Sequence, residues 1–136
     1  MVKEIMKDPL FLTQKSEPAT QADISVGRDL MDTLAAHREG CVGMAANMIG
    51  VRKNIIIVNR GMVDQVMFNP VILSKKNSYD TEEGCLSLVG VRKTTRYEEI
   101  TVEFRDFAWK LQRQTFTGWT AQIVQHEIDH CNGILI

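Results

Sequence analysis

Two histidines near the end of the chain, His126 and His130, have the spacing of a pair of metal ligands. Side chains four positions apart lie on the same face of a helix, so both imidazoles can reach one ion. Glu127 follows the first histidine, where H-E-x-x-H motifs carry the general base that acts on a metal-bound water. Such a short motif also arises by chance, so the pair alone leaves open an ordinary buried helix with hydrogen-bonded histidines.

A cysteine upstream offers a third ligand. Cys85 lies in the segment of residues 83–87, which reads E-G-C-L-S. A thiolate with two imidazoles makes a three-ligand site with an open fourth position, as catalytic metal centres have. A cysteine alone is more often a small buried apolar side chain, but Gly84 beside it allows a close approach of the backbone to another group. Together the three candidates favour a metal centre.

The composition is that of an ordinary globular protein. With 136 residues, the chain is long enough for a single domain, residues 1–136, to bury a core unaided. The formal net charge is −1 with both signs interspersed, so we expect no nucleic-acid partner. The apolar runs are too short for a membrane span, and the first residues lack the apolar stretch of a secretory signal. Three cysteines without a paired spacing predict reduced thiols and a cytoplasmic protein.

The pattern of apolar residues predicts the elements that must hold these groups. A capping sequence at residues 20–23 and helical spacing after it predict a helix that ends by Gly40. Short β-rich segments predict strands at residues 54–59, 66–73, 100–104 and 111–116. From Trp119 to Gly133 the helical period returns, with Trp119, His126 and His130 on one face. The predicted class is α+β, with antiparallel β-sheets packed around a central helix that carries the H-E-x-x-H metal motif.

Three motifs, taken in order, resemble those of the peptide deformylases. These metallohydrolases remove the formyl group from the initiator methionine of nascent bacterial polypeptides. Residues 43–50 look like the family segment G-x-G-L-A-A-x-Q-x-G, and E-G-C-L-S and Q-H-E-x-D-H are unaltered at residues 83–87 and 125–130. The resemblance extends from Asp8 to Leu135, and the second and third motifs together are highly specific.

The resemblance implies a reaction and a set of residue roles. Cys85, His126 and His130 would bind Fe²⁺ in the cell, or Zn²⁺ or Ni²⁺ after purification. Glu127 would take a proton from the attacking water and later deliver one to the leaving amine. The developing oxyanion would lie between the metal and the backbone amide of Leu86.

The resemblance also implies how N-formylmethionyl peptides bind. Gly43 and Gly84 would let an extended peptide approach the backbone of the site and pair with it like a strand. Arg92 matches a basic residue of the family that contacts the substrate backbone. On sequence grounds a solvated arginine explains Arg92 equally well.

Three positions depart from the family pattern. Met48 replaces the glutamine whose amide donates to the oxyanion, and a thioether cannot donate a hydrogen bond. Cys41 replaces the first glycine of the first motif, and Gln122 replaces an apolar residue that lines the methionine pocket. Two functions therefore remain open. One is a working deformylase with activity reduced by Met48, and the other is a metal- and peptide-binding protein of this fold with little or no catalytic activity.

Overall fold

The computed structural model describes residues 1–85 and 88–135 and, of residues 88 and 89, only the backbone. In chain order the elements are α1 (Pro9–Leu12), η1 (Gln21–Asp23), α2 (Ile24–Ala36), β1 (Gly43–Ala45), η2 (Ala46–Ile49), β2 (Ile55–Asn59), β3 (Asp64–Cys85), β4 (Leu88–Arg105), β5 (Leu111–Thr117) and α3 (Gly118–Cys131). The strands pair antiparallel in the order β1-β2-β3-β4-β5, so each lies beside its neighbour in sequence. The predicted α+β class is confirmed. The prediction of separate sheets is wrong, since the described strands form one continuous sheet.

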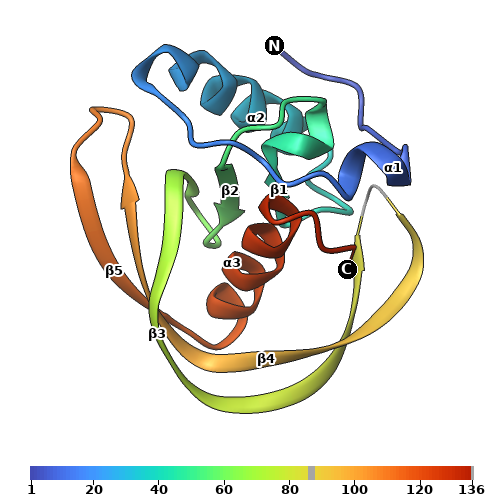
Figure 1. The fold of residues 1–136 in the computed structure, drawn as a ribbon, viewed down its shortest axis with the longest axis vertical. Coiled ribbons are helices and arrows are strands. Elements are labelled where there is room, and N and C mark those ends of the chain that lie inside the picture. The colour runs from blue at the N-terminus through green and yellow to red at the C-terminus, as the bar shows by residue number, and fades with distance from the viewer. Residues whose placement is uncertain (86–87, 136) are drawn as a thin grey trace.

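The sheet is strongly curved, and α3 lies within the curve (Figure 1). The register between β3 and β4 shifts at Phe68/Val71, Ile72/Ser74 and Gly84/Cys85. Such bulges bend a strand and increase its twist, which allows two long strands to pass around a helix. β3 and β4 extend well beyond the predicted segments because their middle residues are exposed and polar, with little apolar alternation to mark a strand.

The predicted first helix is present but shorter than expected. The capping sequence works in part as predicted, since the Thr20 backbone N–H donates to Asp23 Oδ2 at 2.8 Å. The helical stretch then runs only to Ala36, and turns occupy the residues before Gly40. The buried face of α2 includes Leu30 and Leu34, which pack against the sheet near β1 and β2.

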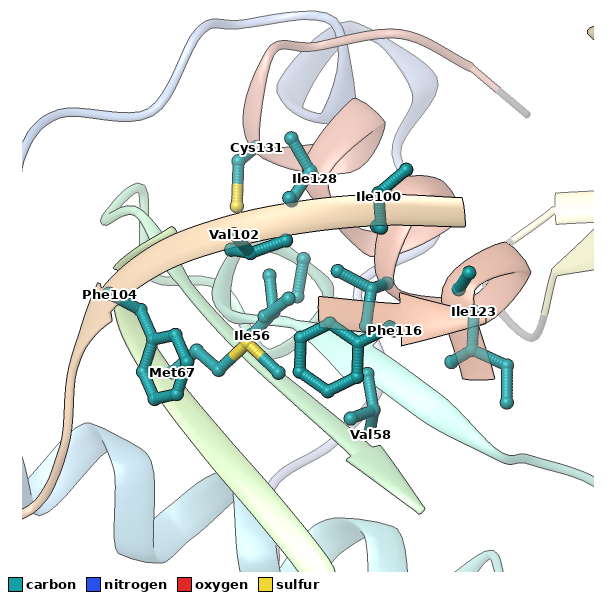
Figure 2. Close-up of a cluster of buried hydrophobic side chains, with 13 residues drawn as sticks. Ile56, Val58, Met67, Ile100, Val102, Phe104, Phe116, Ile123, Ile128 and Cys131 are labelled. Carbon is teal, nitrogen blue, oxygen red and sulfur yellow. The ribbon is translucent and has the colours of Figure 1, made fainter. Parts of the chain in front are cut away.

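Strand β2 lies at the centre of the molecule, because both of its faces are covered. Ile56 and Val58 point towards α3, whereas Ile55 and Ile57 point towards the side covered by α2. Figure 2 shows the cluster on the α3 side, where Phe116 of β5 and Val102 of β4 also meet the helix. Burial on both faces explains why the segment reads as an unbroken apolar run.

Most of α3 is buried, as its apolar pattern predicts, and the exception is at its first turn. The buried positions run from Ala121 to Cys131 and leave only Gln122 and Asp129 partly exposed. Trp119 lines the same pocket as His126, in agreement with the predicted shared face, but its side chain is 61% exposed. At the other end, the Gly133 N–H donates to the His130 carbonyl with φ +75°, which glycine adopts without strain. No helix in residues 1–85 or 88–135 has the length and apolar character needed to cross a membrane.

Candidate metal centre

The last two turns of α3 bring the two histidines together, and the end of β3 adds the cysteine. His126 Nε2 and His130 Nε2 are 3.0 Å apart, and Cys85 Sγ lies 3.3 Å from His130 Nε2. The three candidate ligand atoms all fall within 4.8 Å of one another. Cys85 is partly exposed while both imidazoles are buried, so the group is reached from one side. The structure thus brings together all three residues predicted as ligands.

A buried carboxylate fixes the orientation of the first histidine. His126 Nδ1 lies 2.7 Å from Glu83 Oε1, and a carboxylate held by an arginine can only accept, so Nδ1 donates. His126 Nε2 is thereby left facing Cys85 and His130. An imidazole that donates its second N–H to a carboxylate is a common arrangement behind metal ligands, where it sets the tautomer and the ring angle.

Arg96 completes this network, which the sequence did not reveal. Its Nε and Nη2 donate to Glu83 at 2.9 and 2.7 Å, and its Nη1 donates to Asp129 at 2.6 Å. Arg96 and Glu83 are 3% and 8% exposed, so each charge depends on the other for compensation. No role was predicted for Glu83, Arg96 or Asp129. The one signal in the sequence was that Glu83 is a charged residue directly before Gly84 and Cys85 in the E-G-C-L-S segment.

The electrostatics of the cluster favour positive charge where the ligand atoms meet. Burial acts to raise the pKa of Glu83, but hydrogen bonds from His126 and Arg96 outweigh it and lower the pKa to about 2. Burial acts to lower the pKa of His126, yet its hydrogen bonds to Cys85 and Glu83 raise it. The pKa of His130 is lowered by burial and then by the charge of His126. The surroundings therefore favour a positive charge on His126 and oppose a second one on His130.

Glu127 lies beside the cluster as a buried carboxyl group. It is 4% exposed, and its Oε1 has no hydrogen-bond partner among the described residues. Burial raises the pKa of Glu127 to about 7, against the opposing charge of His126. A carboxyl group with a pKa near neutrality is suited to take and return a proton. Glu127 lines the same pocket as Cys85 and His126 and is not one of the three clustered ligand candidates, so its role as general base stays a prediction.

Cys85, Glu83, His126 and Glu127 line one pocket of about 510 Å³. We call residues 40–43, at the start of β1, its first wall and residues 82–85, at the end of β3, its second wall. Residues of α3 form the floor. Gly43 and Gly84, both predicted as substrate-binding, both line this pocket. β1 is an edge strand of the sheet, and an edge is where an extended chain can pair with a sheet. The complete lining is Gly40, Cys41, Val42, Gly43, Met48, Glu82, Glu83, Gly84, Cys85, Trp119, Gln122, Ile123, His126 and Glu127.

The residues that depart from the family pattern also lie here. Met48 is 1% exposed and lines the pocket, and its Sδ accepts from the Ala45 backbone N–H at 3.4 Å. The neighbouring Asn47 points away from the pocket residues, since its Nδ2 donates to the His130 carbonyl at 2.7 Å. Cys41 donates to the Gly43 carbonyl at 3.0 Å, and burial raises the pKa of its thiol to about 11. Cys41 is therefore a second thiol in the pocket, held protonated.

Two other predicted site residues are less defined by the structure. Arg92 pairs with Glu83 in the register of β3 and β4, and its Nη1 is buried without a partner among the described residues. It is not part of the pocket lining formed by those residues, so a contact with substrate stays a prediction. Leu86, whose amide was expected at the oxyanion, lies outside the described residues.

The donor set fits a divalent transition metal. One thiolate and two imidazoles suit zinc, iron and nickel better than magnesium or calcium, which prefer oxygen ligands. The Glu83 carboxylate behind His126 and the preference for positive charge support the same fit. With an open side towards the pocket and a buried carboxyl group beside it, the site has the composition of a hydrolytic metal centre.

Comparison with known proteins agrees with this class. The sequence model "Polypeptide deformylase" matches residues 2–136. A peptide deformylase of Clostridium beijerinckii is 56% identical over 136 residues, covering 100% of both chains. The fold resembles a peptide deformylase from Legionella pneumophila, with a TM-score of 0.88, 33% identity and coverage of 99% of this chain and 83% of that one. A Met-Ala-Ser-bound class I type b peptide deformylase from Acinetobacter baumannii gives a TM-score of 0.87 at 30% identity, covering 99% and 97%. The chain belongs to the polypeptide deformylase family, which is a family of enzymes.

Proposed function

We propose that this chain is a metal-dependent deformylase that acts on N-formylmethionyl peptides in the cytoplasm, where nascent chains are made and thiols stay reduced. The observation that carries the proposal is the meeting of Cys85, His126 and His130 beside the buried carboxyl group of Glu127. Family membership supports the reaction, and the Acinetobacter baumannii relative was described with Met-Ala-Ser bound. This tripeptide is what remains when formyl-Met-Ala-Ser loses its formyl group.

Cys85, His126 and His130 would hold the cofactor, with Fe²⁺ as the ion in the cell and Zn²⁺ or Ni²⁺ as alternatives in purified protein. When bound, the ion would supply Lewis-acid activation of water and of the formyl carbonyl. Glu83 would hold His126 in the tautomer that leaves Nε2 free to bind, with Arg96 keeping Glu83 ionised.

Glu127 would move the proton in both halves of the reaction. Its carboxylate would accept a proton from water as the water oxygen bonds to the formyl carbon. The same group would then return the proton to the peptide nitrogen as the C–N bond breaks, releasing formate and a free amine. The pKa of about 7 places Glu127 between its two protonation states near neutral pH, as such a shuttle requires.

The peptide would lie extended along the outer edge of β1, in the pocket that Gly43 and Gly84 both line. We assign the Leu86 amide to the oxyanion and Arg92 to the peptide backbone as family-derived proposals. Confinement between two walls would also restrict the reacting carbonyl to one orientation.

A second function is favoured by one observation at Met48. Met48 lines the pocket, its sulfur accepts the Ala45 N–H, and it offers no donor to an oxyanion. Loss of one such donor costs about 10²–10³ in turnover in other hydrolases. The alternative is thus a metal- and peptide-binding protein of this fold with little or no catalysis.

The test is formate release from formyl-Met-Ala-Ser by anaerobically prepared Fe²⁺ protein. A working deformylase releases formate catalytically, and the Glu127→Ala variant retains its metal but loses turnover, because Glu127 moves protons and holds no metal. Metal content by elemental analysis serves as the control for both proteins. Binding of Met-Ala-Ser without turnover at full metal occupancy would support the alternative function instead. Loss of metal from Glu127→Ala would contradict the role given to Glu127.

A further inference from the structure

Gln122 is a polar side chain in the pocket floor that the proposed reaction does not use. It lies on α3 and is partly exposed towards the pocket that also contains His126 and Glu127. The neighbouring floor residues Trp119 and Ile123 are apolar. A single amide in an otherwise apolar part of a pocket is the kind of group that orients a ligand and sets its selectivity.

The orientation of this amide is fixed by the surrounding side chains. Gln122 Nε2 donates to Glu83 Oε2 at 2.9 Å, and Gln122 Oε1 accepts from the Tyr79 hydroxyl at 3.3 Å. A carboxylate can only accept, so the nitrogen must face Glu83. A primary amide nitrogen carries two N–H groups, and the second has no partner among the described residues. The pocket therefore contains an oriented donor with one hydrogen to spare.

Helix geometry places Gln122 about one turn before His126, within reach of the first side chain of a peptide in the same pocket. Gln122 precedes His126 by four residues, which corresponds to about 6 Å along the helix axis. A methionine whose formyl carbon reacts beside His126 and Glu127 places its sulfur three bonds beyond its Cα. An extended methionine side chain lying along α3 thus brings its sulfur near Gln122.

We propose that Gln122 is a specificity-determining residue, whose free N–H donates to the sulfur of the first residue and favours methionine over side chains of equal shape without an acceptor. This inference rests on the proposed function, because it takes the reacting carbon to lie beside the Cys85, His126 and His130 cluster. Packing against Trp119 and Ile123 holds a sulfur and a methylene group almost equally well. The hydrogen bond alone separates them, by about 3- to 10-fold.

Norleucine tests this assignment, because it replaces the methionine sulfur with a methylene group. We would measure kcat/KM for formyl-Met-Ala-Ser and formyl-Nle-Ala-Ser at matched metal occupancy, in the wild type, Gln122→Met and Tyr79→Phe. The wild type is expected to prefer methionine by about 3- to 10-fold, and Gln122→Met to show a ratio near 1. Any general loss from the missing Gln122–Glu83 bond affects both substrates and cancels in the ratio. Tyr79→Phe is the matched control, expected to keep the preference because Glu83 still orients the amide nitrogen.

Affinities for the products separate this inference from the proposed function. Calorimetry of Met-Ala-Ser and Nle-Ala-Ser needs no turnover, and the same preference should appear in the wild type and vanish in Gln122→Met. If neither formylated peptide is hydrolysed but the affinity ratio behaves this way, deformylation fails and the assignment of Gln122 stands. Equal ratios in the wild type and Gln122→Met, in both turnover and affinity, would overturn the assignment.

Discussion

Replacing Gly43 with alanine tests how closely the first pocket wall packs on the proposed general base. A methyl group on Gly43 would lie 2.9 Å from Glu127 Oε2, 2.8 Å from Ile123 Cγ2 and 3.0 Å from the Ile57 carbonyl oxygen. Carbon atoms in good contact are ~3.5 Å or more apart, so Ile123 would have to retreat by about 0.7 Å. The two side chains come from α3 and the carbonyl from β2, so the methyl group is confined from both sides.

Two consequences of Gly43→Ala follow from these distances. Overpacking of a buried site costs typically about 1–3 kcal/mol, so the free energy of unfolding should fall by that amount. The Glu127 carboxylate would be displaced by several tenths of an ångström. Since a misplacement of about 1 Å can cost about 10²-fold, we expect kcat to fall by about 10-fold. Urea unfolding and formate release at equal metal content measure the two effects.

Gly84 on the opposite wall is the matched control. A methyl group there would lie 3.6 Å from the Gly90 carbonyl oxygen and 3.9 Å from Val91 Cγ1, which are ordinary contacts. Gly84→Ala should therefore keep its stability, and any loss should appear in KM if the peptide approaches this wall closely. Wild-type stability together with wild-type kcat in Gly43→Ala would refute the reasoning, because it would mean that the wall yields without moving Glu127.

Three further predictions concern other parts of the molecule. Met48→Gln should raise turnover by up to the order of 10²–10³, with the Ala45 N–H available to the new carbonyl oxygen; equal turnover at matched metal occupancy would show that Met48 is not limiting. The Fe²⁺ form should lose activity in air as the metal or Cys85 oxidises, and full activity after prolonged aeration would contradict this. Asp64 accepts hydrogen bonds from Arg38 and Asn59. These bonds lower the pKa of Asp64, although burial acts to raise it. A lowered folded-state pKa gives stability that is present above the unfolded value of about 4 and lost as pH falls through the folded value. Asp64→Asn should thus be less stable than wild type at pH 7, with the difference shrinking in denaturant titrations as pH falls below the unfolded value.

Local chemistry was readable from the sequence where it depends on neighbours along the chain. The two histidines share a helix face because residues four apart always do, and the capping contact of Thr20 with Asp23 spans three residues. The class of the fold and the order of its main elements followed from apolar periodicity. The same reasoning failed where periodicity is weak, in the exposed middle of β3 and β4.

Tertiary structure decided which distant groups meet. Arg96 on β4 can balance the charge of Glu83 on β3 only because these two strands pair. It also reaches Asp129 only because α3 packs against the sheet. Gly43 proved to be a position of close packing against Glu127, whereas Gly84 has room for a side chain. No pattern along the chain encodes such contacts, because they depend on the curvature of the sheet.

The sequence by itself determined the reactive groups of this protein: the cysteine, the two histidines and the glutamate, with the helix that carries three of them. Only the fold decided how those groups are held. Burial of Glu127 sets its pKa near neutrality, Glu83 sets the tautomer of His126, and the network of Glu83 and Tyr79 aims Gln122 into the pocket. Desolvation and hydrogen-bond direction arise from atoms brought together across the whole chain, and for that reason they cannot be read from spacing alone.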